Sequence, residues 1–575
     1  MRGVVPPADS RLIAMQFEAA AGLSRLRALN ENFGAATPDL VEAVLDEAAR
    51  FASGFLTPLN DAGDREGCVL AEGRVRTAPG HREAYDAYVA GGWPTLDQPT
   101  GEGGQGLPLA LAFAVQEIFD RSCPAFGMLP VPQRSAARLI AAYGDAAMKA
   151  EWLAPLISGA WAATICISEA EAGSDVGRLR TRAEPTGDGE WAITGEKCWI
   201  SFGDHDLTPR IGHCLLARTA GTDGLSLFLV PDSIGPDRIG PNRIGEARNG
   251  VVVRRIEEKM GLHASPTCAL GFEGARGRLI GTEGRGLQQM FVMITNMRLA
   301  TGAQGLAIAA GAADLALTYA RERRQGGNGG APVPIHRHAD VQRILLEQAA
   351  KVEVLRGLLL ATANLGDLAA HEPEEEARKD AAALLQWLLP LVKTTGGEFA
   401  FDVASDAIQV LGGAGYTREW PAEQMLRDAR VLTIFEGTTG IQALDLLHRR
   451  LGGDRRGLRA FLAQAREDAA AQEGARALLP VLDLLEDAAQ RLAQMSDPRA
   501  AEAGATAFLH LAALAATGWI AARLTAIAGA GPEAERLRAA GRHWLTLIPA
   551  RAAACHAEST QGLVLIEEFA NIDAG

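Results

Sequence analysis

Apolar side chains recur at helical spacing through much of the first 160 residues. The apolar positions from Leu40 to Phe51 fall on one face of a helix, and Thr37 and Pro38 in front of them have the types favoured at a helix start. The same spacing resumes over residues 109–156, whereas the glycine- and proline-rich residues 93–108 predict a loop. We therefore predict an N-terminal helical domain over residues 1–160.

From Trp161 to Leu279 the pattern changes to short β-type runs separated by turn residues. The runs 191–193 and 198–201 flank a Thr-Gly-Glu-Lys sequence and predict a hairpin. Two more strands are expected over 214–217 and 225–230, with a turn between them. A small β domain with a barrel-like sheet is predicted over residues 161–280.

Helical periodicity returns at Leu287 and continues through long alanine-rich helices to Leu451. We predict a C-terminal four-helix-bundle domain over 281–451, a boundary at Gly452 and Gly453, and an extra helical extension over 452–575. The chain as a whole is predicted to be a multidomain α+β protein.

One segment of the extension raises the question of a membrane. Residues 505–522 carry no formal charge, and the length of this stretch is close to that of a membrane-spanning helix. The segment is mostly alanine and includes His510, Thr517 and Gly518. We therefore predict a buried bundle helix and no transmembrane segment.

Composition excludes several classes of protein. At 575 residues the chain is long enough for several domains, and its net charge of −14 disfavours a nucleic-acid-binding protein. Seven scattered cysteines without a CxxC spacing argue against a disulfide framework and a metal site. The N-terminus has no apolar signal region, so a cytoplasmic enzyme is expected.

Three segments carry candidate chemistry, and the first runs from Cys166 to Asp175 with the sequence CISEAEAGSD. A strand that ends in a loop with Gly173 and Ser174 offers hydroxyl and amide donors to a phosphate or to a cofactor edge. The alternative is a structural turn capped by Ser174 and Asp175.

The second segment is Trp199-Ile200-Ser201 at the end of the predicted hairpin. An indole and a hydroxyl that leave a strand together can flank a planar ring and form a hydrogen bond with it. A core tryptophan beside a surface serine is the alternative.

The third segment runs from Arg427 to Gln442 with the sequence RDARVLTIFEGTTGIQ. Glu436 follows an apolar run and precedes the flexible Gly437-Thr438. A glutamate desolvated on one side has its pKa raised toward that of a useful general base. Taken alone, however, a carboxylate at this position favours a helix N-terminal cap.

Together the three segments, in this order across a helix–β–helix layout, resemble the acyl-CoA dehydrogenase family from about residue 40 to 450. The family patterns are (V/M)(T/S)EPxAGSD, WI(T/S) and RDARxxxI(Y/F)EGT. Gln409 to Tyr416, QVLGGAGY, is similar to the family's QxxGGxGY, and Tyr319 begins a YAxxR-like helix. GDHDLT at 203–208 and EEKMGLHASPTC at 257–268 resemble a longer subgroup, with a C-terminal helical extension, that includes enzymes similar to 3-methylmercaptopropionyl-CoA dehydrogenase.

The resemblance implies an FAD cofactor, an acyl-CoA substrate and Glu436 as the catalytic base. It implies cofactor contacts by the following residues: Cys166, Ile167, Ser168, Trp199, Ile200, Ser201, Arg323, Gln409, Gly412, Gly413, Gly437 and Thr438. Ser174 and Arg298 would approach the CoA. For Arg298 and Arg323 the alternative is an ion pair on a helix surface. In the family the Gln409 and Gly413 positions contact the FAD of a second subunit, which implies a homodimer or a dimer of dimers.

The sequence departs from the family pattern at four places. Ala170 replaces the usual proline, and Arg178 occupies a position that is usually small. Gly326-Gly327 stands where many members have Phe-Gly, and Gly440 stands where many have a glutamine that touches FAD. These departures put individual contacts in doubt and leave the base in place.

The implied reaction is α,β-dehydrogenation of an acyl-CoA to a trans-2-enoyl-CoA in fatty-acid β-oxidation, with electrons leaving through an electron-transfer flavoprotein. An acyl-CoA oxidase would use the same site but pass electrons to O₂. Nucleic-acid-associated flavin relatives instead use a basic C-terminal domain. Residues 451–575 contain 12 arginines, no lysine and 15 acidic residues, which disfavours that class.

Overall fold

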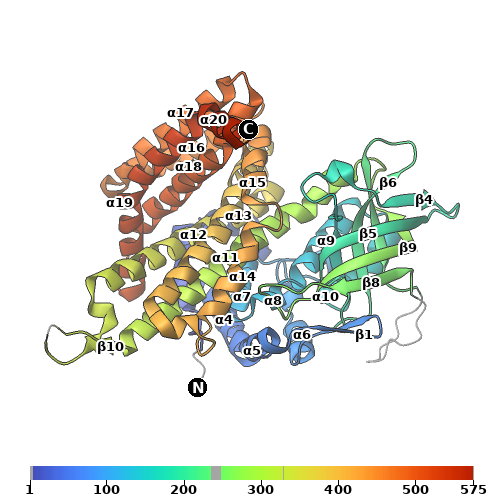
Figure 1. The fold of residues 1–575 in the computed structure, drawn as a ribbon, viewed down its shortest axis with the longest axis horizontal. Helices are drawn as coiled ribbons and strands as arrows, with labels where there is room; N and C mark the ends of the chain where they lie inside the picture. Colours follow the sequence, from blue (N-terminus) through green and yellow to red (C-terminus); the bar gives the residue numbers. More distant parts are fainter. Residues whose placement is uncertain (1–3, 235–247, 328, 574–575) are drawn as a thin grey trace. The chain divides into compact units, whose positions relative to one another are not determined.

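The computed structural model describes residues 4–234, 248–327 and 329–573 (Figure 1). The chain forms two compact units. One unit, called here the β unit, comprises residues 47–107 and 118–300; the other, called the helical unit, comprises residues 1–46, 108–117 and 301–575. The helices α4 (Pro38–Phe51), α7 (Leu109–Ser122) and α11 (Gly286–Glu322) each contribute to both units.

The β unit combines short helices with one large sheet. Its remaining helices are η1 (Ala52–Leu56), α5 (Thr57–Glu66), α6 (His81–Ala90), η2 (Trp93–Thr95), η3 (Thr100–Glu102), α8 (Pro124–Gly127), α9 (Pro130–Tyr143), α10 (Ala146–Ser158) and η4 (Val176–Arg178). Its strands are β1 (Val69–Ala71), β2 (Arg74–Arg76), β3 (Ala162–Cys166), β4 (Arg182–Pro185), β5 (Trp191–Ser201), β6 (Ile211–Thr219), β7 (Leu225–Pro231), β8 (Val251–Ile256) and β9 (Thr267–Leu279). The loop predicted over 93–108 is irregular apart from η2 and η3, each a single 3₁₀ turn.

The large sheet closes on itself as a small barrel. Its strand order is β3-β6-β4-β5-β9-β7, and β7 pairs again with β6, while β8 pairs with β9. Closure satisfies the main-chain groups that an open sheet leaves at its edges. The predicted barrel-like β domain is confirmed, and so is the predicted turn between the strands at 214–217 and 225–230, which belong to the antiparallel pair β6–β7.

The hairpin predicted over residues 191–201 is wrong, because these residues form the single strand β5. Gly195, which suggested a turn, lies within the strand. A Cβ at Gly195 would come within 2.5 Å of the Thr181 hydroxyl. This glycine therefore lets Thr181 approach the strand closely and does not form a turn. Lys197, expected at the turn, is 1% exposed in the strand.

Residues of the two subgroup motifs hold a segment much earlier in the chain, residues 64–75. Asp204 of GDHDLT accepts hydrogen bonds from the Val75 amide at 2.7 Å and from Arg74 Nε at 3.0 Å, which holds the β1–β2 hairpin. His263 of the second motif lies 3.0 Å from Asp64 at the end of α5. This hairpin lies within the segment predicted to be an N-terminal helical domain. Its two strands are joined by the short turn Glu72-Gly73, in which both residues have positive φ.

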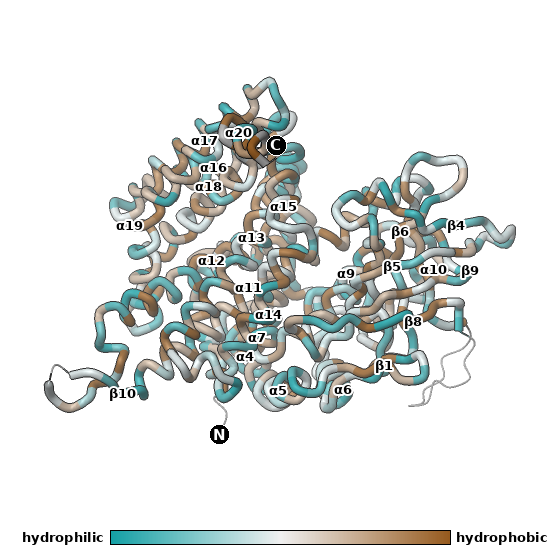
Figure 2. The backbone as a smooth tube through the Cα atoms, in the orientation of Figure 1, coloured by the Kyte–Doolittle hydropathy of each residue, from teal (hydrophilic) through white to brown (hydrophobic). Residues whose placement is uncertain are grey.

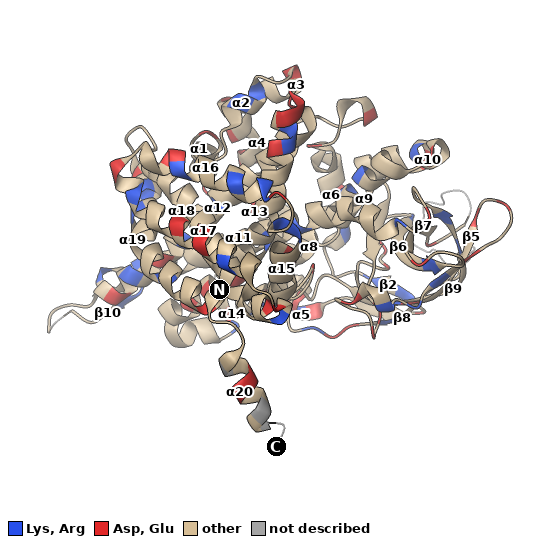
Figure 3. Cartoon of the chain, turned by 90° about the horizontal axis from the view of Figure 1, so that it is seen from above, with Lys and Arg blue, Asp and Glu red and all other residues tan. Residues whose placement is uncertain are grey.

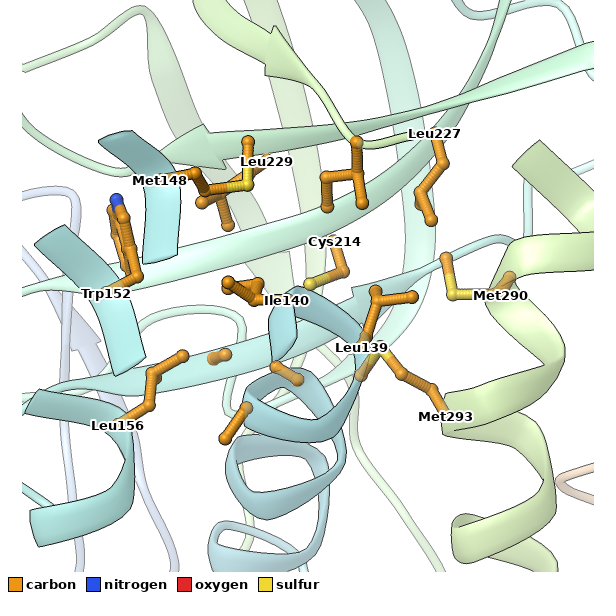
Figure 4. Packing of buried hydrophobic residues seen from close by; sticks show 14 of the residues in the cluster. Leu139, Ile140, Met148, Trp152, Leu156, Cys214, Leu227, Leu229, Met290 and Met293 are labelled. Carbon is orange, nitrogen blue, oxygen red and sulfur yellow. The ribbon is translucent and has the colours of Figure 1, made fainter. Parts of the chain in front are cut away.

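A hydrophobic core joins the barrel to α9, α10 and the first turns of α11 (Figure 4). Figure 4 shows side chains from these helices meeting those of β6 and β7. Trp152 on α10 is 1% exposed, and Cys214 on β6 is fully buried. Helical and β-type apolar periodicities thus point into one core.

The helical unit is built from long helices. Besides parts of α4, α7 and α11, it contains α1 (Ser10–Ala19), α2 (Leu23–Arg27), α3 (Glu31–Gly34), β10 (Arg324–Gln325), β11 (Val333–Pro334), η5 (Ile335–Arg337), α12 (Ala339–His371), α13 (Glu375–Leu411), η6 (Gly412–Tyr416), α14 (Ala422–Ala429), η7 (Arg430–Thr433), α15 (Thr439–Asp445) and η8 (Leu446–Arg450). The extension adds α16 (Arg456–Ala470), η9 (Glu473–Leu478), α17 (Leu479–Gln494), α18 (Pro498–Thr525), α19 (Pro532–Thr560) and α20 (Val564–Asp573). The predicted extra helices are therefore present.

Helix α18 contains the uncharged segment 505–522. Among the described residues it is the one helix long and apolar enough to cross a membrane, and 72% of its most apolar window is buried inside the protein. It packs tightly against α19, because a Cβ at Gly504 would come within 2.1 Å of the Ser559 carbonyl. Figure 2 shows apolar and polar stretches mixed along the neighbouring helices α16–α19. This environment agrees with the predicted bundle helix.

Charged residues of both signs are interspersed over the helices of the extension (Figure 3). Several form local ion pairs, such as Arg466 with Asp483 and Glu486 at 2.9 and 2.7 Å. A surface of mixed sign lacks the one-sided positive field that a phosphate backbone requires.

A buried ion cluster ties the extension to the rest of the helical unit. Arg356 of α12 donates to Glu117 of α7 at 2.8 Å and also pairs with Glu353 of α12. Glu353 in turn accepts from Gln16 of α1 at 2.8 Å and pairs with Arg536 of α19 at 3.0 Å. These three charged residues are buried: Arg356, Glu117 and Glu353 are each at most 3% exposed. Removing one charge would therefore leave a buried partner charge without compensation from water.

We predict that Arg356→Leu lowers the free energy of unfolding by about 3–5 kcal/mol, because buried Glu117 loses its cation and buried Glu353 keeps only Arg536. Urea titration followed by circular dichroism measures the change. Arg50→Leu is the matched control, since its pair with Glu47 is exposed and should be worth less than about 1 kcal/mol. Equal stability of Arg356→Leu and the parent protein would contradict the prediction.

Candidate functional site

The first two candidate segments lie side by side in the β unit. The amide of Cys198 donates to the carbonyl of Ser168 at 3.0 Å, which joins the loop after β3 to the last third of β5. Ser168 and Ser201 are both half-buried, so their hydroxyls are partly accessible. Two motifs about 30 residues apart in sequence are thus brought together by one main-chain hydrogen bond.

A buried lysine fixes this junction from behind. Lys197 Nζ donates to the Ile167 carbonyl at 3.0 Å and to Glu169 Oε1 at 2.8 Å. Glu169 also accepts from the Thr181 hydroxyl at 2.6 Å. Burial alone would raise the pKa of Glu169, but the Lys197 ammonium and these hydrogen bonds outweigh it and hold the pKa below its ordinary value. The sequence patterns gave Lys197 and Glu169 no role, although a lysine among strand residues can indicate a buried charged partner.

Trp199 is turned outward by a β-bulge. Along β5 Lys197 and Ile200 are three positions apart, whereas their partners on β9, Leu270 and Cys268, are two positions apart. Trp199 takes up the extra residue with φ +63°, and its side chain is 61% exposed. Bulges re-aim side chains beside functional sites. The alternative of a core tryptophan is wrong.

The other members of the two segments divide between core and surface. The side chains of Cys166 and Ile200 are buried in the barrel core, so a ligand cannot contact these side chains. Burial raises the pKa of the Cys166 thiol to about 12, which keeps it protonated. Ile167 packs partly against the helix-facing core.

The proposed CoA residues differ in exposure. Ser174 lies exposed in the loop after β3, and Asp175 precedes η4 without making a side-chain cap, so Asp175 does not cap this turn as the structural alternative expected. Arg298 in α11 is 6% exposed. A helix-surface ion pair therefore does not describe Arg298.

Glu436 lies in a short connection between η7 and α15 in the helical unit. It is half-buried and has φ +56°, a left-handed conformation that is unusual for a residue with a Cβ. Helix α15 begins three residues later, and its N-cap is Thr438, whose hydroxyl accepts from the Ile441 amide at 3.3 Å. Glu436 is therefore not the helix cap that the simpler interpretation favoured.

Two buried side chains hold the main chain at this strained position and just after it. Gln442 Nε2 donates to the Glu436 carbonyl at 2.8 Å, and Lys393 Nζ donates to the Gly437 carbonyl at 2.7 Å. Both donors are fully buried. Such fixed donors can keep a backbone in a sparsely populated conformation, which is typical of functional sites. The sequence reading missed Lys393, although a lone lysine in the apolar run WLLPLVKTT signals a buried partner.

The remaining predicted cofactor residues of the helical unit are exposed. Arg323 follows α11, and within the described residues it forms no ion pair, so the surface-pair alternative is not supported. Gln409, Gly412 and Gly413 lie at the end of α13, and a Cβ at either glycine would meet nothing within 4 Å.

Models of three domains match the chain in order. The acyl-CoA dehydrogenase N-terminal domain matches residues 39–160, the middle domain 164–275 and the C-terminal domain 284–452. The chain belongs to the acyl-CoA dehydrogenase family. It is accordingly an oxidoreductase that uses FAD to dehydrogenate acyl-CoA thioesters.

Known relatives agree with this membership. A 3-methylmercaptopropionyl-CoA dehydrogenase of Ruegeria pomeroyi is 40% identical over 500 residues, 84% of each chain. An acyl-CoA dehydrogenase of Bacillus anthracis complexed with FAD has the same fold, with a TM-score of 0.72, 20% identity and coverage of 91% of this chain and 92% of that one. A chain from a structure described as an electron transferring flavoprotein of Acidaminococcus fermentans has a TM-score of 0.58 and 27% identity, covering 71% of this chain and 98% of that one.

The residues present fit a flavin. In the β unit, an exposed indole stands beside the half-buried hydroxyls of Ser168 and Ser201, which suits a planar, hydrogen-bonding ring. In the helical unit, Arg323 offers a guanidinium fork suited to phosphate oxygens, and the open glycines leave room for a close approach.

We predict that Trp199→Gly makes the FAD-free protein more stable than Trp199→Ala by about 1 kcal/mol, because glycine accepts the left-handed backbone at position 199 without steric cost. Urea titration of the two FAD-free proteins measures the difference. Both variants lose the ring, so fluorescence titration should show that both bind FAD more weakly than the parent. Equal stabilities would contradict the inferred strain.

Proposed function

We propose that Glu436 is the general base that removes the α-proton of the acyl-CoA substrate. The observation that carries this proposal is the pair of buried donors, Gln442 and Lys393, that fix the strained main chain around a half-buried carboxylate. A base must be held within hydrogen-bond reach of its proton, and a rigid loop provides this more reliably than a mobile one.

An α C–H bond of a thioester is a weak acid, so negative charge on the thioester oxygen must be stabilised as the proton leaves. We assign this to the main-chain amide of Glu436, an oxyanion-hole arrangement supported by the fixed backbone. The Glu436 carboxylate receives the α-proton. FAD, when bound, supplies the acceptor for the hydrogen and two electrons of the Cβ–H bond, so that the product is a trans-2-enoyl-CoA.

In this proposal the β unit holds the flavin ring. Trp199 covers one face, while the hydroxyls of Ser168 and Ser201 and the exposed side of Ile167 contact its edge. Cys166 and Ile200 contribute main-chain atoms only, because their side chains are in the core. Together these groups orient the ring and keep water from the reacting carbons.

We propose that Arg323, Arg298 and the Ser174 hydroxyl bind the phosphate-bearing parts of FAD and CoA. Arg323 contacts the FAD pyrophosphate, and Gly437 and Thr438 contact FAD next to the base. Thr438 does so through its main chain, because its hydroxyl caps α15. Ser174 and the buried Arg298 approach the CoA.

We further propose that electrons leave to an electron-transfer flavoprotein. The 27% identity to a chain from the Acidaminococcus fermentans electron transferring flavoprotein structure supports this kind of acceptor.

The enzyme is proposed to act as a homodimer in which Gln409, Gly412 and Gly413 of one subunit contact the FAD of the other. The support is a cluster of exposed groups at the end of α13, where Tyr416 is 84% exposed. An aromatic side chain so open to water is typical of a surface that becomes covered on association.

We predict that Glu436→Gln slows flavin reduction by substrate by about 10²–10⁴-fold, because the amide cannot accept the proton. Anaerobic stopped-flow absorbance measures the rate, with acyl-CoA substrates of several chain lengths and a methylthio-acyl-CoA, since the curated relative acts on the latter kind. FAD and acyl-CoA should remain bound, because glutamine preserves shape.

Glu423→Gln is the matched control. This glutamate lies in the preceding helix and pairs with Arg427 at 2.7 Å, so its loss should leave the reduction rate within about twofold. A near-normal rate in Glu436→Gln would place the base elsewhere, and loss of FAD would give Glu436 a structural role.

We predict that Tyr416→Glu weakens the dimer and lowers its FAD content together, because a charge at this surface opposes burial and the cofactor is shared between subunits. Sedimentation velocity and the ratio of flavin to protein absorbance measure the two effects. Val69→Glu, which alters an apolar side chain 56% exposed on β1, is the control and should change neither. A Tyr416→Glu protein that is monomeric and fully loaded with FAD would contradict the shared site.

A further inference from the structure

We propose that the C-terminal extension positions the Glu436 loop through His510 of α18, which holds Glu398 of α13 against Thr439, the first residue of α15. The inference rests on the proposed role of Glu436 and assigns the extension a part in the same reaction. His510 acts through other groups and is therefore a positioning residue.

A single carboxylate oxygen makes the connection. His510 Nε2 lies 3.1 Å from Glu398 Oε1, and the Thr439 hydroxyl donates to the same oxygen at 3.4 Å. Thr439 is only three residues beyond Glu436. The extension therefore reaches the start of α15 through one intermediate side chain.

Helix α13 holds the segment 437–439 at two points, and the extension supports one of them. Lys393 donates to the Gly437 carbonyl, and Glu398 accepts from Thr439. Lys393 is fully buried among its neighbours, whereas Glu398 is about one-third exposed and takes its cationic partner from α18. Removing His510 would leave Glu398 free to swing toward water and release Thr439.

Contacts at the far end of the same helix show that α18 lies along α15 and η8. His448 of η8 pairs with Glu502 of α18 at 3.1 Å. Glu502 and His510 are eight residues apart on α18, which corresponds to about 12 Å along a helix. Thus α18 runs antiparallel to the α15–η8 segment and supports both of its ends.

The charge on His510 strengthens the contact. The hydrogen bond to Glu398 raises the pKa of His510, burial opposes this, and the charges of Glu398 on α13 and Glu558 on α19 raise it further. Because the folded pKa lies above the ordinary value, the ionic contact is complete at low pH and weakens as pH rises through the folded pKa. The His510 side chain is 37% exposed, so the expected effect on rate is modest.

The test compares three holoenzyme variants. His510→Leu removes the donor and His510→Gln retains a neutral donor. His543→Gln makes the same neutral replacement in a similar pair, His543 with Glu347 at 3.0 Å, that joins α19 to α12. We expect His510→Leu to slow substrate-driven flavin reduction about two- to fivefold with KM nearly unchanged, the range expected for a part-exposed ion pair. His510→Gln should recover most of the rate, and His543→Gln should match the parent.

Hydrogen exchange supplies a readout that does not depend on the identity of the base. Amides in the peptide covering residues 434–442 should exchange faster in His510→Leu than in the parent or in His543→Gln. The rate ratio of parent to His510→Gln should also fall toward one as pH rises, because only the parent loses an ionic contact.

The outcomes separate this inference from the proposed function. If His510→Leu equals the parent in both rate and exchange, or if His543→Gln is slowed to the same degree, the positioning role is wrong even when Glu436→Gln is inactive. If Glu436→Gln remains active while His510→Leu still exchanges faster at 434–442, the base assignment fails and the support of this loop by the extension stands.

Discussion

Two buried lysines, each donating to a main-chain carbonyl, are the constraint on which the strained segment in each unit depends. Lys197 holds the Ile167 carbonyl behind the bulge that exposes Trp199, and Lys393 holds the Gly437 carbonyl beside Glu436. Both Trp199 and Glu436 have positive φ. A buried ammonium is costly unless it is fully paired, so each lysine fixes the backbone that satisfies it.

The two strained positions belong to different units and present different kinds of side chain. The barrel presents an indole and hydroxyls suited to a flavin, whereas the helical unit presents a carboxylate on a residue whose own carbonyl and the next one are held by buried donors. Strain at such positions persists only where the surroundings over-determine the backbone. In the β unit a closed sheet does this, and in the helical unit buried side chains of α13 and α15 do.

The extension shares buried contacts with the rest of the helical unit. Arg536 of α19 enters the buried cluster of Arg356 and Glu353, and α18 packs along α15. Its helices therefore share buried charges with helices near the N-terminus. This arrangement explains how residues so late in the chain can influence the loop that carries Glu436.

The sequence by itself determined the order of helices, barrel and helices, the family, the cofactor and the residues that carry its motifs. Apolar periodicity and turn residues act locally, so they can be read from neighbouring positions. The structural role of Gly195 could not be predicted in this way, because a glycine in a turn and a glycine that allows the close contact with Thr181 look the same in sequence. Nor could the sequence tell that Trp199 faces outward, since one bulged residue reverses the alternation along β5. Only the tertiary structure revealed Lys393 and His510 as supports of the Glu436 loop, because their partners Gly437 and Glu398 lie 44 and 112 residues away and are chosen by packing.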